Sequence, residues 1–103
     1  MTLQIRVVLP AHLRALARIA NNDEVTIEIE GEASVSAIID SLEHLYPMLC
    51  GTLRERRTNR RRSLVRFFAC EQDITHDSPD SPLPEAIARG VEPLIIIGAI
   101  AGG

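Results

Sequence analysis

The sequence contains no lysine and no tryptophan, and its only aromatic residues are Tyr46, Phe67 and Phe68. Its eleven basic side chains are therefore all arginines, and its core has to be built from aliphatic side chains. A length of 103 residues with 46% apolar content is typical of one globular domain. A chain of this size buries about two-thirds of the surface that it exposes when unfolded, which supports one modest core.

Cysteine and long apolar runs are also scarce. Cys50 and Cys70 form no CxxC pair and have no histidine at metal-ligand spacing, so we expect buried or half-buried thiols and no metal site. The longest apolar run, residues 94–101, is far shorter than the ~20 residues of a membrane-spanning helix. The opening MTLQIRVVLP lacks the charged start, long apolar stretch and cleavage site of a signal peptide. We therefore expect a cytoplasmic protein with no membrane partner.

Two early segments have the pattern of β-strands. Residues 3–9 and 25–29 alternate apolar and polar side chains, which is typical of half-buried strands, and we expect them to form a hairpin. Pro10 ends the first strand because proline cannot donate a hydrogen bond to the strand ladder. Between the two strands the sequence predicts a short helix over residues 12–20 and a turn at 21–23.

The clearest helix covers residues 35–45. Ser34 is a good N-terminal cap, and Tyr46 precedes Pro47 and therefore avoids helical angles. One face of this helix is apolar and is expected to be the main packing surface over the sheet. The apolar face consists of Val35, Ile38, Ile39, Leu42 and Leu45.

The second half of the chain returns to strands. In order, the sequence predicts an irregular arginine-rich stretch (48–62), a strand (64–70), a tight turn (71–73), a short edge strand (74–75), a loop (76–84), a short helix (84–90) and a last strand (94–97). The last strand is apolar on both faces, as strands at the centre of a sheet are. This order predicts an α+β fold of the β-grasp type, with a mixed sheet of four or five strands packed on one main helix. The first and last strands lie side by side in that fold.

Positive charge is concentrated in one segment. Residues 54–66 contain seven arginines and one acid, a net charge of +6, whereas the flanking segments 1–53 and 67–103 are net negative. The segment can be a solvated loop, a phosphate-binding patch or a docking surface for an acidic partner. Nucleic-acid binding is disfavoured because few aromatic residues lie near it and the rest of the domain is acidic. The candidate partner-facing residues are Arg60, Arg61 and Arg62, together with whichever of Phe67 and Phe68 points away from the core.

The sequence ends directly after the last strand in Gly98, Ala99, Ile100, Ala101, Gly102 and Gly103. Fully extended, these residues reach ~20 Å, enough to enter a partner's pocket while the domain stays outside. A terminal carboxylate is ionised at neutral pH and inert toward nucleophiles, but ATP can convert it to an acyl-adenylate. A sulfur donor can then displace AMP and leave a thiocarboxylate. Glycine suits both steps because it leaves the carbonyl unhindered and the backbone slim.

With these residues in view, the chain resembles the MoaD/ThiS family of ubiquitin-like sulfur carriers over nearly its whole length. The resemblance is carried by the segments IRVVLP, ASVSAIIDSLEHLYP, VRFFACEQDI, SPDSPLPEAIARGVEPLIIIG and the terminal AIAGG. It implies a β-grasp domain over residues 1–97 and an extended tail over 98–103. It also implies that Gly103 is the residue that is adenylated and thiocarboxylated, while residues 98–102 thread into the partner.

The resemblance implies two partners. One resembles the ubiquitin-activating adenylyltransferases, uses ATP and contains the adenylation site, and the other is a biosynthetic enzyme that accepts the sulfur. This chain would then hold no permanent cofactor or metal and have no catalytic residue. It would be a carrier, or the small subunit of a heteromeric sulfurtransferase such as molybdopterin synthase.

Three departures from the family leave the pathway open among molybdopterin, thiamine, cysteine and tungsten-type cofactor synthesis. Residues 48–63 make the chain longer, as in carriers that feed cysteine synthesis; Cys70 replaces a common asparagine; and Gly98-Ala99 replaces a proline-rich lead-in. Two other functions fit the same tail. One is a modifier joined to lysines of other proteins, which has no side-chain amine for building chains on itself because it has no lysine. The other is a β-grasp interaction module whose tail is idle.

Overall fold

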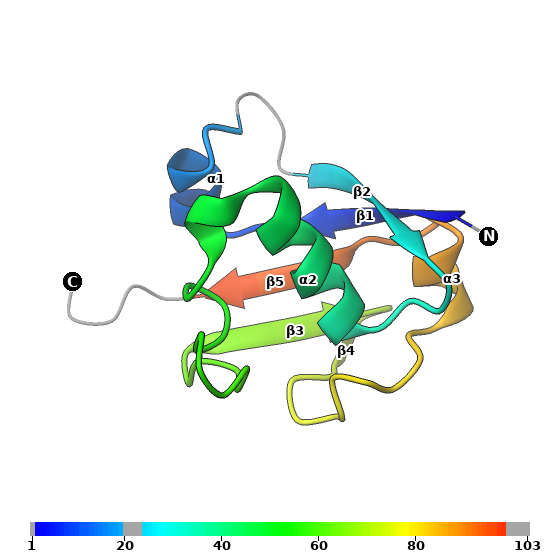
Figure 1. The fold of residues 1–103 in the computed structure, drawn as a ribbon. Helices are drawn as coiled ribbons and strands as arrows, with labels where there is room; N and C mark the ends of the chain where they lie inside the picture. The colour runs from blue at the N-terminus through cyan, green and yellow to red at the C-terminus, as the bar shows by residue number, and fades with distance from the viewer. Residues whose placement is uncertain (1, 20–23, 99–103) are drawn as a thin grey trace.

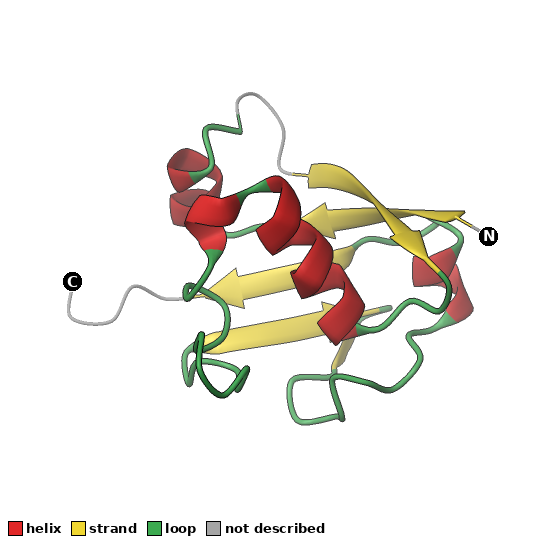
Figure 2. Ribbon diagram, in the orientation of Figure 1, coloured by secondary structure: helices red, strands yellow, loops and turns green. Residues whose placement is uncertain are grey.

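The computed structural model describes residues 2–19 and 24–98 as one sheet with helices packed on it (Figure 1). The strands are β1 (Thr2–Val8), β2 (Glu24–Glu30), β3 (Val65–Ala69), β4 (Gln72–Asp73) and β5 (Leu94–Gly98). The helices are α1 (Ala11–Leu16), α2 (Val35–Leu45), α3 (Glu85–Ala88) and the 3₁₀ turn η1 (Pro47–Leu49). Figure 2 shows α2 crossing one face of the sheet. No helix within the described residues is long and apolar enough to cross a membrane.

The sheet has the order β2-β1-β5-β3-β4, so the last strand lies at its centre as expected. β1 and β2 form the predicted antiparallel hairpin, in which Ile5 pairs with Ile27. β1 and β5 are parallel neighbours, and β5 is antiparallel to β3. The predicted pairing of the first strand with the last is therefore confirmed, and the sheet has five strands.

The main helix follows the sequence expectation closely. The Oγ of Ser34 accepts a hydrogen bond from the backbone N–H of Ala37 at 3.1 Å, which satisfies one of the unpaired N–H groups of the first turn. The apolar face packs on the aliphatic side chains of the sheet, and Leu42 is completely buried. Leu45 is the exception, because its side chain in the last turn is 52% exposed.

The helix α1 ends at Leu16, whereas the sequence predicted that it reaches residue 20. Arg18 adopts a left-handed conformation (φ 59°). The N–H of Ile19 donates to the carbonyl of Arg14, and the N–H of Arg18 donates to the carbonyl of Ala15. This is the Schellman arrangement that closes helices, in which glycine usually occupies the left-handed position. The predicted turn at residues 21–23 lies outside the described residues.

The short edge strand was predicted at residues 74–75, and this position is wrong. Cys70 and Glu71 both have positive φ and form a two-residue turn of the kind that joins twisted antiparallel strands, so β4 begins at Gln72. Cys70 therefore lies at an exposed corner, contrary to the expectation of a buried or half-buried thiol, while Cys50 is half-buried. Beyond β4, the hydroxyl of Thr75 accepts a hydrogen bond from the backbone N–H of Phe67 at 2.9 Å.

The arginine-rich loop (residues 50–63) is tied to the domain by two of its own arginines. The guanidinium of Arg54 is nearly buried and bonds to Asp40 and Glu43 of α2, at 2.9 Å for Glu43. Burial alone would lower the pKa of Arg54, but these bonds outweigh burial and raise it. Arg61 donates to the carbonyl oxygens of residues 62, 63 and 65, which fixes the end of the loop against β3.

We expect Leu42→Ala to lower the free energy of unfolding by about 2–5 kcal/mol, because it leaves a cavity between α2 and the sheet. Leu45→Ala, on the same helix but half exposed, is the matched control and should change stability by no more than about 0.5 kcal/mol. Urea denaturation followed by circular dichroism measures both values. Equal losses for the two variants would contradict this placement of α2.

Arg54→Ala should destabilise the domain by about 1–3 kcal/mol, because it removes charge-assisted hydrogen bonds and leaves Glu43 without its cation. Arg57→Ala is the control, because Arg57 is exposed in the same loop. Amide hydrogen exchange should show faster exchange across residues 50–63 in Arg54→Ala only. If both variants exchanged alike, Arg54 would not anchor the loop.

Candidate functional site: the end of the last strand

The candidate functional site is the end of β5, from which the Gly-Gly sequence continues. Gly98, which the sequence assigned to the tail, is instead the last residue of β5 and the last described residue, because it pairs with Val65 at the start of β3. A methyl group on Gly98 would lie 3.6 Å from the Pro10 ring and 3.7 Å from the His12 imidazole, which are ordinary van der Waals contacts, so Gly98 lies beside the segment that follows β1. The predicted tail residues Ala99, Ile100, Ala101, Gly102 and Gly103 lie outside the described residues.

The strand register directs β5 out of the domain. The parallel pairing with β1 joins Val7 to Leu94 and Val8 to Ile95, and β1 ends at Val8. The last three residues of β5 therefore run past the end of β1 and keep only β3 as a paired neighbour. Because these pairs lie at the sheet centre, the position of Gly98 is set by the core of the domain.

An exposed apolar surface adjoins this end of β5 on the side of the sheet away from α2. In antiparallel strands, paired residues share one face, so the pairing of Phe68 with Ile95 puts both side chains on this outer face. Ile97 follows on the same face and is 49% exposed, and Leu64, in the turn just before β3, is 44% exposed. We call Leu64, Phe68, Ile95 and Ile97 the apolar outer patch.

The structure separates the two phenylalanines that the sequence left undecided. Phe67 is 3% exposed and belongs to the core, where it pairs with Ile96. Phe68 is half-buried on the outer face, so it alone stays a candidate for partner contact. The period of two had placed them on opposite faces without indicating which face was buried.

The structure also divides the arginines of residues 54–66 into two groups. Arg54 and Arg61 hold the loop in place, so Arg61, a predicted partner-facing residue, already bonds to backbone carbonyls. Arg66 lies 3.8 Å from Asp73, whose pKa is lowered by hydrogen bonds from Thr75 and, less strongly, by Arg66. The remaining arginines are exposed and have no acidic partner within the described residues. They are Arg56, Arg57, Arg60 and Arg62.

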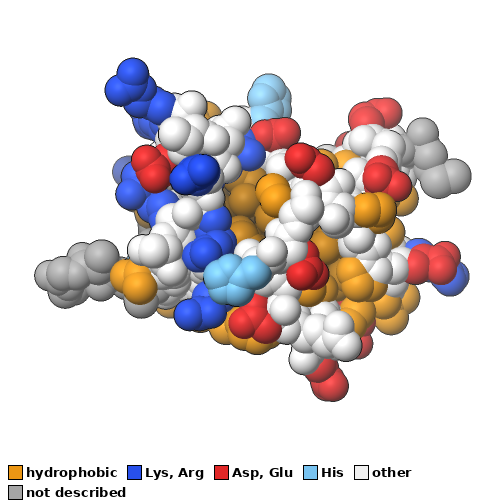
Figure 3. Space-filling view, turned by 90° about the horizontal axis from the view of Figure 1, so that it is seen from below, with side chains coloured by type: hydrophobic (Ala, Val, Ile, Leu, Met, Phe, Trp, Pro, Cys, Tyr) orange, Lys and Arg blue, Asp and Glu red, His pale blue; other side chains and the backbone are white. Residues whose placement is uncertain are grey.

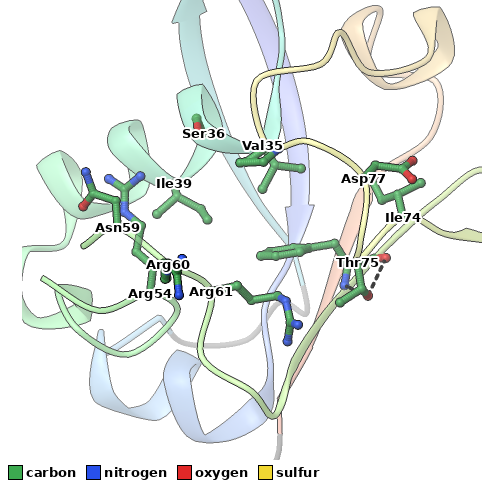
Figure 4. A pocket seen from close by; sticks show the side chains of 12 residues that line it. Val35, Ser36, Ile39, Arg54, Asn59, Arg60, Arg61, Ile74, Thr75 and Asp77 are labelled. Carbon is green, nitrogen blue, oxygen red and sulfur yellow. Dashed lines mark hydrogen bonds between the residues drawn. The ribbon is translucent and has the colours of Figure 1, made fainter. Parts of the chain in front are cut away.

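A cavity of about 360 Å³ opens between α2, the arginine-rich loop and residues 74–79 (Figure 4). Val35, Ile39 and Phe67 are among its apolar lining residues. Arg60 and Arg61 line one side, and Asp77 lies on the other. Sequence reasoning missed this cavity because its walls come from segments far apart in the chain. The only available signal was the apolar face of the 35–45 helix.

The described residues show no constellation suited to metal binding. Across residues 2–19 and 24–98, no three His, Cys, Asp or Glu side chains are placed to hold an ion together. Within the same segments, no buried side-chain nitrogen or oxygen lacks a hydrogen-bond partner, so none is left aimed at a missing ligand.

No known protein-family model and no curated protein matches the chain. Two solved structures do. The crystal structure of SAMP1 from Haloferax volcanii matches with a TM-score of 0.68 at 20% identity, covering 97% of this chain and 99% of SAMP1. CysO, in the BexX/CysO complex of Amycolatopsis orientalis, matches with a TM-score of 0.66 at 20% identity, covering 95% of this chain and 98% of that one. The resemblance to MoaD/ThiS-type ubiquitin-like carriers is thus confirmed at the level of the fold, which is β-grasp.

Proposed function

We propose that this chain is a sulfur carrier whose working group is the carboxyl of Gly103. The observation that supports this most is the register of β5, whose last residues run past the end of β1 up to Gly98, after which the sequence continues as AIAGG. Small residues there leave the backbone slim enough to enter a partner's active site. The domain would stay outside and supply the binding surface.

The chemistry has two steps. A Gly103 carboxylate oxygen attacks the α-phosphorus of ATP, which forms an acyl-adenylate and releases pyrophosphate. A hydrosulfide ion then attacks the carbonyl carbon, the bond to the AMP oxygen breaks, and AMP leaves with its electron pair. The product is a thiocarboxylate, which donates its sulfur to an enzyme of cysteine, molybdopterin or thiamine synthesis. The cytoplasm, which supplies the ATP, is the compartment for this reaction.

Both steps would take place in a partner that resembles the ubiquitin-activating adenylyltransferases. The described residues contribute docking rather than catalysis, and the apolar outer patch beside the end of β5 is the surface we assign to it. Exposed apolar groups next to a projecting segment are typical of protein contact sites. CysO, which shares this fold, was solved in complex with BexX, which supports an enzyme partner for this chain as well.

An activated Gly103 could also be joined to lysine amines of other proteins. The chain itself offers no side-chain amine for attaching a second copy, because it contains no lysine. Isopeptide-linked Gly103 on cellular proteins would indicate conjugation. Free thiocarboxylate would indicate sulfur transfer.

The test is the intact mass of the chain after incubation with ATP, Mg²⁺, sulfide and the adenylyltransferase of the same organism. We expect the mass to rise by the difference between a sulfur and an oxygen atom, with the change located in the C-terminal peptide. Gly103→Val should slow the conversion by about 10²-fold, because the side chain displaces the carboxyl from the reacting geometry. Val91→Ala, at an exposed site far from the tail, is the control and should react normally. Unimpaired conversion of Gly103→Val would contradict the proposal.

A further inference from the structure

We propose that Arg56, Arg57, Arg60 and Arg62 form a basic collar beside the end of β5 that docks onto an acidic rim around the tail-receiving pocket of the partner. This inference rests on the proposed function, because it concerns the protein that takes up the tail. The occupant of the collar is a cluster of aspartate and glutamate side chains on that protein. The sequence placed these arginines in one loop, and only the fold shows where the loop lies.

The collar is fixed next to the tail by the backbone. Val65 pairs with Gly98. The carbonyl oxygen of Val65 also accepts a hydrogen bond from the guanidinium of Arg61 at 2.9 Å. The guanidinium of Arg62 donates to the carbonyl of Gly51, which closes the two ends of the loop on each other. The loop is therefore held at the residue that pairs with the end of β5, as Figure 1 shows.

The charges of the collar are not neutralised within the described residues. Two arginines outside the loop have acidic partners: Arg6 bonds to Glu24 at 2.7 Å, and Arg89 lies 4.0 Å from Glu85. The four collar arginines have no such partner, and the loop that carries them contains a single acid, Glu55. Like charges gathered in one loop repel each other, so an acidic surface that binds the loop relieves this repulsion.

The rest of this end of the molecule is basic as well. The segment from α1 to residue 18 adds the exposed Arg18 and contains no acid. By contrast, residues 70–85, which follow β3, contain acids but no arginine. In Figure 3, blue side chains gather over the end at which β5 finishes, and most red ones lie over the other half. This uneven charge distribution orients the domain so that the end carrying β5 approaches a negatively charged surface first.

The surroundings of the collar favour a protein over a nucleic acid. Two exposed residues of the apolar outer patch adjoin the loop, Leu64 just before β3 and Ile97 in β5. Arginines beside apolar side chains are typical of protein interfaces. Sites for single-stranded nucleic acids offer aromatic side chains on which bases stack. The loop contains none, since the aromatics of the chain are Tyr46, Phe67 and Phe68.

The test is the association rate of the full chain with the adenylyltransferase of the same organism, measured by stopped-flow fluorescence at low and high salt. We expect Arg56→Glu/Arg60→Glu to associate at least tenfold more slowly than the wild type at about 50 mM salt, because steering is lost. The difference should shrink to about twofold at about 500 mM salt, where the charges are screened. Arg56→Lys/Arg60→Lys keeps the charge and should associate within about twofold of the wild type.

Arg89→Glu is the matched control, because it reverses one exposed arginine away from the collar. Equal rates and equal salt dependence for the wild type and the Arg56→Glu/Arg60→Glu variant would overturn the collar. Tighter binding to a labelled single-stranded RNA 20-mer than to the enzyme, at the same salt, would also overturn it by identifying a nucleic acid as the occupant. Thermal unfolding of each variant confirms that the domain is intact.

The two proposals fail separately. If the wild type gains sulfur while the arginine variants associate normally, the chain is a carrier without a docking collar. If association depends on the collar but no partner converts Gly103 to a thiocarboxylate, the docking proposal is supported and the carrier function is contradicted. The rate and the mass are measured on the same samples.

Discussion

The parallel pairing of β1 with β5 is the contact on which the remaining structure depends. It consists of two residue pairs, Val7 with Leu94 and Val8 with Ile95, between segments at opposite ends of the chain. It brings the last strand to the middle of the sheet, where Leu94 and Ile96 complete the apolar floor under α2. The same register leaves the end of β5 beyond the end of β1, so the pairing that forms the core also determines where the tail begins.

One end of the domain therefore combines three features with different physical roles. The central strand is paired on both sides at its start and with β3 alone up to Gly98, the apolar outer patch exposes apolar area, and the arginine-rich loop provides charge. Apolar burial supplies affinity without direction, whereas charge acts over several ångströms and orients an approaching partner. In the docking that we propose, charge and apolar area beside the end of β5 favour encounters in which the tail enters the partner first.

Much of the fold follows from local pattern. The 35–45 helix, the first hairpin and the central last strand all depend on the periodicity of apolar side chains, which the sequence displays directly. The errors occur where a left-handed residue is not glycine. Arg18 closes α1 early, and Cys70 with Glu71 shifts the edge strand by two positions, and neither turn has a glycine to signal it.

The candidate site was predictable to a smaller extent. The tail could be recognised from its residue types, but the function of each arginine depends on contacts between distant segments. Arg54 is a structural residue because Asp40 and Glu43 lie within reach on α2, and no spacing rule connects these positions. Likewise, alternation places Phe67 and Phe68 on opposite faces, but only the packing of α2 decides which face is covered.

The most direct measurement is the mass of the C-terminal peptide of this protein isolated from its own cells and alkylated with iodoacetamide on lysis. A thiocarboxylate reacts with this reagent at sulfur and a carboxylate does not, so the modification labels the group in question. We expect a fraction of the peptide to end at Gly103 and to carry one alkyl group on its terminal sulfur. A peptide found solely as the free acid during active sulfur assimilation, or one that continues past Gly103, would contradict a sulfur-carrying tail.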